Sequence, residues 1–139
     1  MLVYTEEKKF TKEQVQQLFL SVNWISGNYP ERLYKALMNS STVFTVWDAD
    51  KLVGLTRVLD DTELLAQIHY VLVHPDYQGY GIGSILINNI LDYIKSHSYA
   101  GLNVACSLYA NIGKEAFYEK FGFKKLPNSK YGYGMLIEV

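Results

Sequence analysis

The chain of 139 residues has a single cysteine, Cys106, which excludes an intramolecular disulfide and gives no sign of an oxidising compartment. No apolar run reaches the length of a membrane span, and residues 1–12 lack the apolar segment of a signal peptide. The formal net charge is −1, so no basic excess indicates binding to nucleic acid or to an anionic membrane. We therefore expect a cytoplasmic protein without nucleic-acid or membrane partners.

Metal sites and the two common nucleotide loops are also missing. The histidines and Cys106 show no ligand spacing, so we expect no metal, and Cys106 in an apolar segment predicts an inert core thiol. A Walker loop needs Gly-Lys-Ser/Thr, and no lysine lies between Lys51 and Lys95. The dinucleotide pattern needs a glycine at position 84, which is Ser84.

The remaining composition, 49% hydrophobic and 19% charged, is that of a globular protein, and the length predicts a single domain over 1–139. Thr11 is a good N-cap, and Pro30 favours the start of a second helix. We predict strands over 1–4, 42–47, 51–59, 64–73, 102–108, 123–126 and 133–139, and helices over 11–19, 30–38, 84–97 and 112–120. Gly54 indicates a bulge or a close contact, and Gly122 a C-cap. This order predicts a mixed α/β (α+β) fold, with a mostly antiparallel sheet of about seven strands and about four helices.

One stretch, Gln78-Gly79-Tyr80-Gly81-Ile82-Gly83, joins an apolar strand to an amphipathic helix. The first N–H groups of a helix have no partner within the helix, and the helix dipole adds partial positive charge there. Glycines allow a ligand to approach the main chain closely. The stretch is therefore either a phosphate loop or a plain connection between strand and helix.

The pattern Q-x-x-G-x-G resembles the acetyl-CoA loop of the GNAT superfamily of N-acetyltransferases. Residues 70–77, Tyr-Val-Leu-Val-His-Pro-Asp-Tyr, look like that family's fourth strand and turn, and residues 117–123, Phe-Tyr-Glu-Lys-Phe-Gly-Phe, look like its closing helix-to-strand motif. The resemblance covers roughly residues 42 to 125. It implies the fold predicted above and acetyl-CoA as the co-substrate.

The resemblance also implies site residues. In the family the end of the fourth strand bulges and its free main-chain groups bind the pantetheine arm, which corresponds here to Val71, Leu72 and Val73. The residues that match the cofactor site as a whole are Val71, Leu72, Val73, Gln78, Gly79, Tyr80, Gly81, Ile82, Gly83, Ser84, Asn111 and Tyr118. Tyr118 matches the tyrosine that protonates the leaving thiolate, and Asn111 the asparagine that hydrogen-bonds the cofactor. As plain residues, Val71 and Val73 could equally be core.

Among the site residues, the general base is the one that the sequence defines least. An amine must be neutral to attack, and an alkylamine is mostly protonated at pH 7. Gln67 stands where some family members have a glutamate, and His69 matches a histidine that others use. Strict alternation predicts His69 on the same strand face as Val71 and Val73. His69 is thus a candidate catalytic residue beside Tyr118, with Glu63, Asp60 and Asp61 acting through water as alternatives.

The expected function is acetyl transfer from acetyl-CoA to a primary amine of a small molecule or peptide. A CoA-binding sensor with reduced catalysis remains the alternative, since Gln67 cannot take a proton. Aromatic residues of the predicted pocket, among them Trp24 and Tyr34, could equally be core or a dimer surface, so a homodimer stays open.

Overall fold

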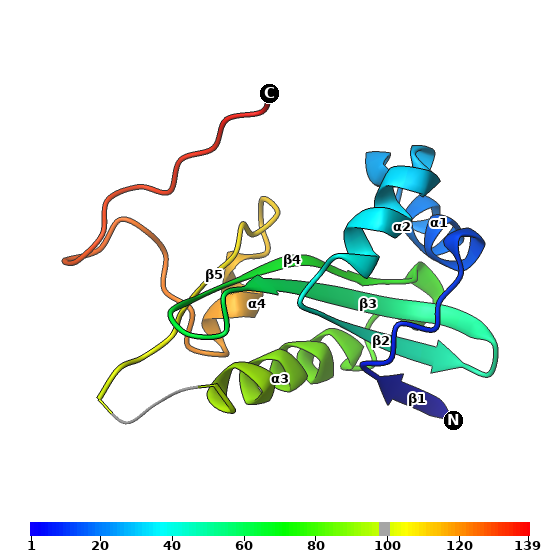
Figure 1. Ribbon diagram of the computed structural model, residues 1–139, viewed down its shortest axis with the longest axis horizontal. Coiled ribbons are helices and arrows are strands. Elements are labelled where there is room, and N and C mark those ends of the chain that lie inside the picture. Colours follow the sequence, from blue (N-terminus) through cyan, green and yellow to red (C-terminus); the bar gives the residue numbers. More distant parts are fainter. Residues whose placement is uncertain (98–100) are drawn as a thin grey trace. The chain divides into compact units, whose positions relative to one another are not determined.

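The computed structural model describes residues 1–97 and 101–139 (Figure 1). They divide into two compact units, Met1–Leu108 and Tyr109–Val139, so the single domain predicted over 1–139 stays a prediction. In chain order the elements of the first unit are β1 (Leu2–Thr5), α1 (Lys12–Ser21), the 3₁₀ helix η1 (Ile25–Asn28), α2 (Pro30–Met38), β2 (Thr42–Asp48), β3 (Lys51–Asp60), β4 (Leu65–Val73), the 3₁₀ helix η2 (Pro75–Tyr77), α3 (Ile82–Lys95) and β5 (Ala105–Ser107). The second unit contains α4 (Glu115–Glu119).

The predicted starts of the first two helices are confirmed. Thr11 is the N-cap of α1, where its hydroxyl accepts from the N–H of Gln14 and its own N–H donates to the Gln14 side chain. This reciprocal pair satisfies two N–H groups that would otherwise lack partners. Pro30 is the first residue of α2, where its fixed φ suits the helix and its missing N–H costs nothing.

The five strands form one sheet in the order β1-β2-β3-β4-β5. The first three pairings are antiparallel and the pairing of β4 with β5 is parallel. Helices α1 and α2 cover one face and α3 covers the other (Figure 1). The mixed α/β class and the mostly antiparallel sheet are confirmed.

Apolar side chains fill both layers of the first unit. On the α1/α2 face, Phe19, Leu37, Leu55 and Leu72 belong to one buried cluster. On the α3 face, the helix buries Ile82, Leu86, Ile87, Ile90 and Ile94, which is the spacing predicted for a core-facing helix. No helix in residues 1–97 and 101–139 is long and apolar enough to cross a membrane.

The sheet has five strands, fewer than the seven expected, because the two C-terminal segments remain unpaired. Residues 123–126 and 133–139 form no strand, although the alternating pattern of Tyr133, Met135 and Ile137 is typical of one. These three side chains are exposed. A strand needs a neighbour for its main-chain N–H and C=O groups, and no described residue pairs with this segment.

Two other predicted elements are shorter than expected. The strand predicted over 102–108 is reduced to β5, and Leu102 is exposed instead of buried. The helix predicted over 112–120 is reduced to α4, whereas α3 begins two residues before the predicted Ser84. Gly122 has a φ of 97°, but the C-cap of α4 is Lys120, two residues before the predicted one.

Gly54 lies at a close approach between the sheet and α3. The β2–β3 register shifts beside it, which confirms the predicted bulge. A Cβ at Gly54 would lie 3.3 Å from a methyl of Ile82, the first residue of α3, and 3.3 Å from a methyl of Val46. Glycine therefore sets how closely the start of α3 sits against the sheet.

Gly54→Val is expected to lower the free energy of unfolding by roughly 1–3 kcal/mol, because the added methyl groups overpack this contact. Gly134→Val is the matched control, since a Cβ there meets nothing within 4 Å. Urea denaturation of both variants checks the prediction. Equal stability of the two would show that the first turn of α3 yields freely.

Candidate active site

The site is organised by a β-bulge at Tyr70 in β4. Arg57 pairs with His69 and Thr56 pairs with Val71, so Tyr70 is an extra residue without a partner in β3. Its φ is 62°, in the left-handed region that costs an ordinary residue about 1–2 kcal/mol. The extra residue lets two successive side chains, those of His69 and Tyr70, lie on one face of the sheet. Their rings are stacked with centroids 3.9 Å apart.

Packing over Tyr70 offsets the strain of its backbone. The ring meets Phe19 edge to face at 4.8 Å and lies 5.6 Å from Trp24. The phenol oxygen is 2.7 Å from the hydroxyl of Ser26 in η1, which ties the loop between α1 and α2 to the bulge. The surroundings therefore fix the left-handed conformation of Tyr70.

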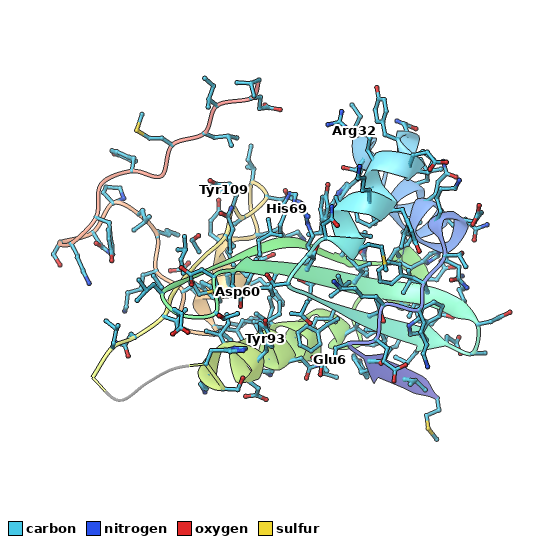
Figure 2. All side chains as sticks on the ribbon, viewed as in Figure 1. Glu6, Arg32, Asp60, His69, Tyr93 and Tyr109 are labelled. Carbon is cyan, nitrogen blue, oxygen red and sulfur yellow. The ribbon has the colours of Figure 1, made fainter. Side chains whose placement is uncertain are left out.

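The bulge overturns the predicted placement of His69. Strict alternation put His69 on the same face as Val71 and Val73, but the register shift moves His69 to the α1/α2 face. Figure 2 shows His69 on the opposite side of the sheet from Tyr93 of α3. Alternation fails here because one inserted residue exchanges the two faces for the rest of the strand.

Beyond the bulge, β4 has a free edge. Pairing with β5 covers only Leu65 to Gln67. The N–H of His74 donates to the carbonyl of Val53 in β3, so alternation directs the N–H of Leu72 toward β3. The N–H groups of Val71 and Val73 then point away from β3, where no described strand accepts them. Leu72, by contrast, is 3% exposed and contributes its side chain to the core.

The glycine loop follows directly. The Gln78 side chain donates to the carbonyl of Val73 at 2.9 Å and so connects the loop to the end of β4. Gly79 and Gly81 have φ of 86° and 83°, which favour glycine, and a Cβ at either would meet nothing within 4 Å. The loop is thus open to solvent, and Tyr80 within it is 77% exposed.

The N-terminus of α3 offers main-chain donors. Gly81 is the N-cap and supplies no side-chain hydrogen bond, and the first helical hydrogen bond runs from Ile85 to Gly81. The N–H groups of Ile82, Gly83 and Ser84 therefore lack helical partners. No acidic residue lies in this first turn, so the dipole favours an anion here.

The free edge of β4 and the start of α3 lie together. Val73 pairs with Gly54, and Ile82 of α3 packs over Gly54. Two sets of unpaired N–H groups, one on a strand and one on a helix terminus, are thereby placed at one end of the sheet. The arrangement can bind an extended ligand that carries a phosphate group and hydrogen-bonding amides.

His69 is bound to Arg57. The guanidinium Nη2 lies 2.6 Å and Nε 3.1 Å from His69 Nδ1. Burial and the positive charge of Arg57 lower the pKa of His69 to about 4, so the ring is neutral at pH 7. Because Nδ1 accepts from Arg57, the proton of the neutral ring resides on Nε2. This geometry makes His69 a hydrogen-bond donor at Nε2 and a poor general base.

Asp61 and Cys106 are also poorly suited to act as a base or a nucleophile. The Asp61 carboxylate accepts from the N–H groups of Glu63, Leu64 and Leu65, which lowers its pKa to about 2. Burial raises the pKa of Cys106 to about 11, which opposes a thiolate nucleophile. Within the described ranges, no three His, Cys, Asp or Glu side chains gather into a possible metal site.

The second unit holds the predicted Tyr118 and Asn111. Tyr118 lies in α4, where its ring meets Phe117 at 5.1 Å and Phe123 at 6.1 Å. Burial raises the pKa of Tyr118, which makes its phenol a weaker acid. Asn111 is exposed, and its carbonyl accepts the N–H of Lys114 ahead of α4. Their predicted roles toward acetyl-CoA stay predictions.

Sequence reasoning missed Arg57 and Ser26. Arg57 is the only charged residue between Leu52 and Leu59 in an otherwise buried strand, and that contrast was a usable signal. Ser26 gave no signal, because its contact with Tyr70 depends on the bulge.

Comparison with known proteins also indicates an acetyltransferase. The model of the acetyltransferase (GNAT) family matches residues 8–123. The uncharacterized N-acetyltransferase ycf52 of Pyropia yezoensis is 30% identical over 132 residues, which cover 92% of this chain and 73% of that protein. The ycf52-like protein of Prochlorococcus marinus is 31% identical over 129 residues, covering 90% of this chain and 69% of that protein.

Solved structures agree. A protein of unknown function from meticillin-resistant Staphylococcus aureus, described as a probable acetyltransferase, has a TM-score of 0.84 and 32% identity, with full coverage of both chains. A GNAT-family acetyltransferase from Streptococcus pneumoniae has a TM-score of 0.80 and 27% identity, covering 100% of this chain and 98% of that one. The chain belongs to the acetyltransferase (GNAT) family.

Proposed function

We propose that this acetyltransferase is an acetyl-CoA-dependent N-acetyltransferase whose acceptor, a primary amine of a small molecule or peptide, attacks the thioester directly. One observation carries the proposal: the outward N–H groups of Val71 and Val73 lie beside the open N-terminus of α3. Such a pair of donor sets suits a ligand with a pyrophosphate at one end and a thioester at the other.

The reaction is balanced without a further reactant. The amine nitrogen forms a bond to the acetyl carbon, and the carbon–sulfur bond breaks. The attacking nitrogen loses a proton, and the CoA thiolate gains one. Donors aimed at the carbonyl oxygen act mainly as negative charge develops there, so the Val71 N–H is the group we assign to polarise the thioester.

The main chain carries most of the binding of acetyl-CoA in this proposal. The pyrophosphate rests on N–H groups between Gly79 and Ser84, with no Lys or Arg in the loop to add charge. Gln78 holds the loop through its bond to Val73, and the N–H groups of Val73 and Val71 meet the pantetheine arm. Leu72 contributes by packing, and Asn111 keeps the hydrogen bond to the cofactor that the family resemblance implies.

His69 is retained as a catalytic residue, but as a donor in place of a base. Its neutral ring offers Nε2–H, for which no described residue is an acceptor. The proton of the amine then leaves to solvent, with the nearby charge of Arg57 favouring the neutral amine. A water-mediated path through Glu63 or Asp60 remains compatible with the same chemistry.

Tyr118 is proposed to stabilise the leaving thiolate. At ordinary pKa values, proton transfer from a phenol to an alkyl thiolate is about 2 kcal/mol uphill, and burial of Tyr118 makes it less favourable still. A hydrogen bond from the phenol to sulfur suffices, because it strengthens as sulfur gains charge. The final proton can then come from solvent.

The direct test combines two readings on the wild-type protein. Free CoA thiol should appear with the acetylated amine in equal amounts when acetyl-CoA is mixed with a panel of primary amines. A protein that binds acetyl-CoA in calorimetry but releases thiol with no amine would instead be a CoA-binding sensor. A protein that binds no CoA species would remove both functions.

Gly83→Val is expected to weaken acetyl-CoA binding at least about tenfold without loss of stability. Side chains in a helix tilt toward its N-terminus, so Val at this position covers the N–H groups of the first turn. Gly81 is unsuitable for this test, because its positive φ would strain any replacement. Asn88→Val, at an exposed position in the middle of α3, is the matched control. Unchanged calorimetric affinity in a folded Gly83→Val variant would contradict the placement of the pyrophosphate.

His69→Ala is expected to lower turnover at least about tenfold, whereas His69→Gln retains most of it. A glutamine can accept from Arg57 through its oxygen and donate through its nitrogen, so it replaces a donor but not a base. With a pKa of about 4, His69 should add no acidic limb above about pH 5, and the profiles of wild type and His69→Gln should share one shape. Equal loss in both variants, with a limb present only in the wild type, would restore His69 as the base.

Tyr118→Phe is expected to lower kcat at least about tenfold and to change acetyl-CoA affinity less, because the lost hydrogen bond matters mainly in the transition state. The ring contacts with Phe117 and Phe123 remain. Phe117→Leu is the control, since it disturbs packing and leaves the phenol. Stopped-flow measurement of thiol release checks both. Loss of activity in Phe117→Leu alone would make Tyr118 a packing residue.

A further inference from the structure

Arg57 is a half-buried cation without a carboxylate partner. The ion pairs of the described residues are Lys9–Glu7, Lys12–Glu31, His74–Asp76 and Lys125–Glu119, and none involves Arg57. Burial lowers the pKa of Arg57, and the phenol of Tyr70, not a carboxylate, opposes this effect. Charged groups withdrawn from water are nearly always paired, so an unpaired guanidinium indicates a missing anion.

The contacts of Arg57 are all with neutral groups. Nε and Nη2 share His69 Nδ1, and Nη1 lies 3.4 Å from both the Ala36 carbonyl and the Ser40 hydroxyl. A guanidinium has five N–H donors, so at least one on Nη2 has no partner among the described residues. Arg57 thus keeps both its charge and donor capacity for a ligand.

A purely structural role does not account for the unpaired charge and free donor of Arg57. The C-terminal end of α2 is already held by Lys8, which donates to the carbonyls of Met38 and Ser40 at 3.0 and 2.5 Å. The contacts of Arg57 with the same region, at 3.4 Å, are long for hydrogen bonds. Arg57 also holds His69 Nδ1 and lies 5.2 Å from the centre of the Tyr70 ring, but none of these contacts supplies the negative charge that usually accompanies a guanidinium withdrawn from water.

Arg57 also stands close to the proposed point of attack. It pairs with His69, which is two residues before Val71 in β4. Consecutive Cα atoms are about 3.8 Å apart, so the His69 and Val71 positions are separated by less than about 8 Å. The guanidinium lies on the α1/α2 face, where Tyr70 and Ser26 add hydroxyl groups.

We propose that the acceptor amine carries a carboxylate, which Arg57 binds while the amine reaches the thioester at Val71. The proposal rests on the N-acetyltransferase function above and names its substrate class. Arg57 and Val71 lie in adjacent strands, where Thr56, the neighbour of Arg57, pairs with Val71, so we expect the carboxylate of the acceptor to be a few bonds from its reacting nitrogen. A free amino acid and a dipeptide, whose free amine and free carboxylate lie one residue further apart, share this chemistry.

The test compares acceptors that differ only in charge: free amino acids, their carboxamides, and dipeptides with a free carboxylate. Wild type should show a kcat/KM at least about tenfold higher for the carboxylate than for the carboxamide of the same amino acid. Arg57→Gln should abolish this preference and leave the KM for acetyl-CoA unchanged. Lys8→Gln, which removes a second cation bound to the end of α2, should keep the preference. Dipeptides that match or exceed free amino acids would identify a peptide as the source of the carboxylate.

A binding measurement provides a second test of the carboxylate site, and this test does not need turnover. Calorimetry should show that the N-acetyl amino acid, the product, binds wild type at least about tenfold more tightly than its carboxamide. This difference should shrink as salt is raised. Acetylation of amines with equal kcat/KM for the carboxylate and carboxamide would overturn this inference and leave the proposed function intact. Absence of acetylation would instead remove the proposed function, while equal binding of the two products would remove the carboxylate site. The wild-type readings decide the matter even if Arg57→Gln does not fold.

Discussion

The site depends on the inserted residue at Tyr70. One extra residue in β4 allows the strand to present His69 to Arg57 before the bulge and free N–H groups after it, which a regular strand could not do together. Before the bulge, β4 pairs with β5 and places His69 beside Arg57. After it, the N–H groups of Val71 and Val73 turn to an edge from which β5 has parted. The left-handed backbone of Tyr70 is held by aromatic packing and by Ser26, so the loop between α1 and α2 is coupled to the geometry of the strand edge.

Glycines complete the arrangement at the other side of the strand. Gly54 admits the start of α3 close to the sheet, and Gly79 and Gly81 supply the positive φ values that direct the chain from β4 into the helix. The absence of a side chain at Gly54 allows close packing, and its absence at Gly79 and Gly81 leaves the helix terminus open. The donors of this end of the sheet are main-chain groups, which only a substitution to proline can delete, and they provide partial positive charge without a Lys or Arg in the loop.

The sequence predicted the periodic elements well, because helix caps and apolar spacing are local signals. Thr11, Pro30 and the apolar stripe of α3 all lie where the pattern placed them. The sequence prediction failed at two places where the structure depends on residues distant in the chain. The alternation argument for His69 could not detect an insertion whose cost is met by Phe19 and Trp24, residues about fifty positions away. The strand pattern of 133–139 describes which side chains alternate, but a strand also needs a neighbour, and that depends on the rest of the fold.

The state of His69 shows how the site's chemistry follows from its charges. A histidine in this strand reads as a base from the sequence, because its ordinary pKa is near neutrality. The neighbouring guanidinium reverses that reading, since it occupies Nδ1 and disfavours a second positive charge. The same charge disfavours an ammonium ion nearby, so an amine bound beside Arg57 loses its proton more readily. A carboxylate on the acceptor would compensate the charge of Arg57 and keep the acceptor in place, so for such an acceptor Arg57 serves recognition and its effect on the protonation of the amine is largely cancelled.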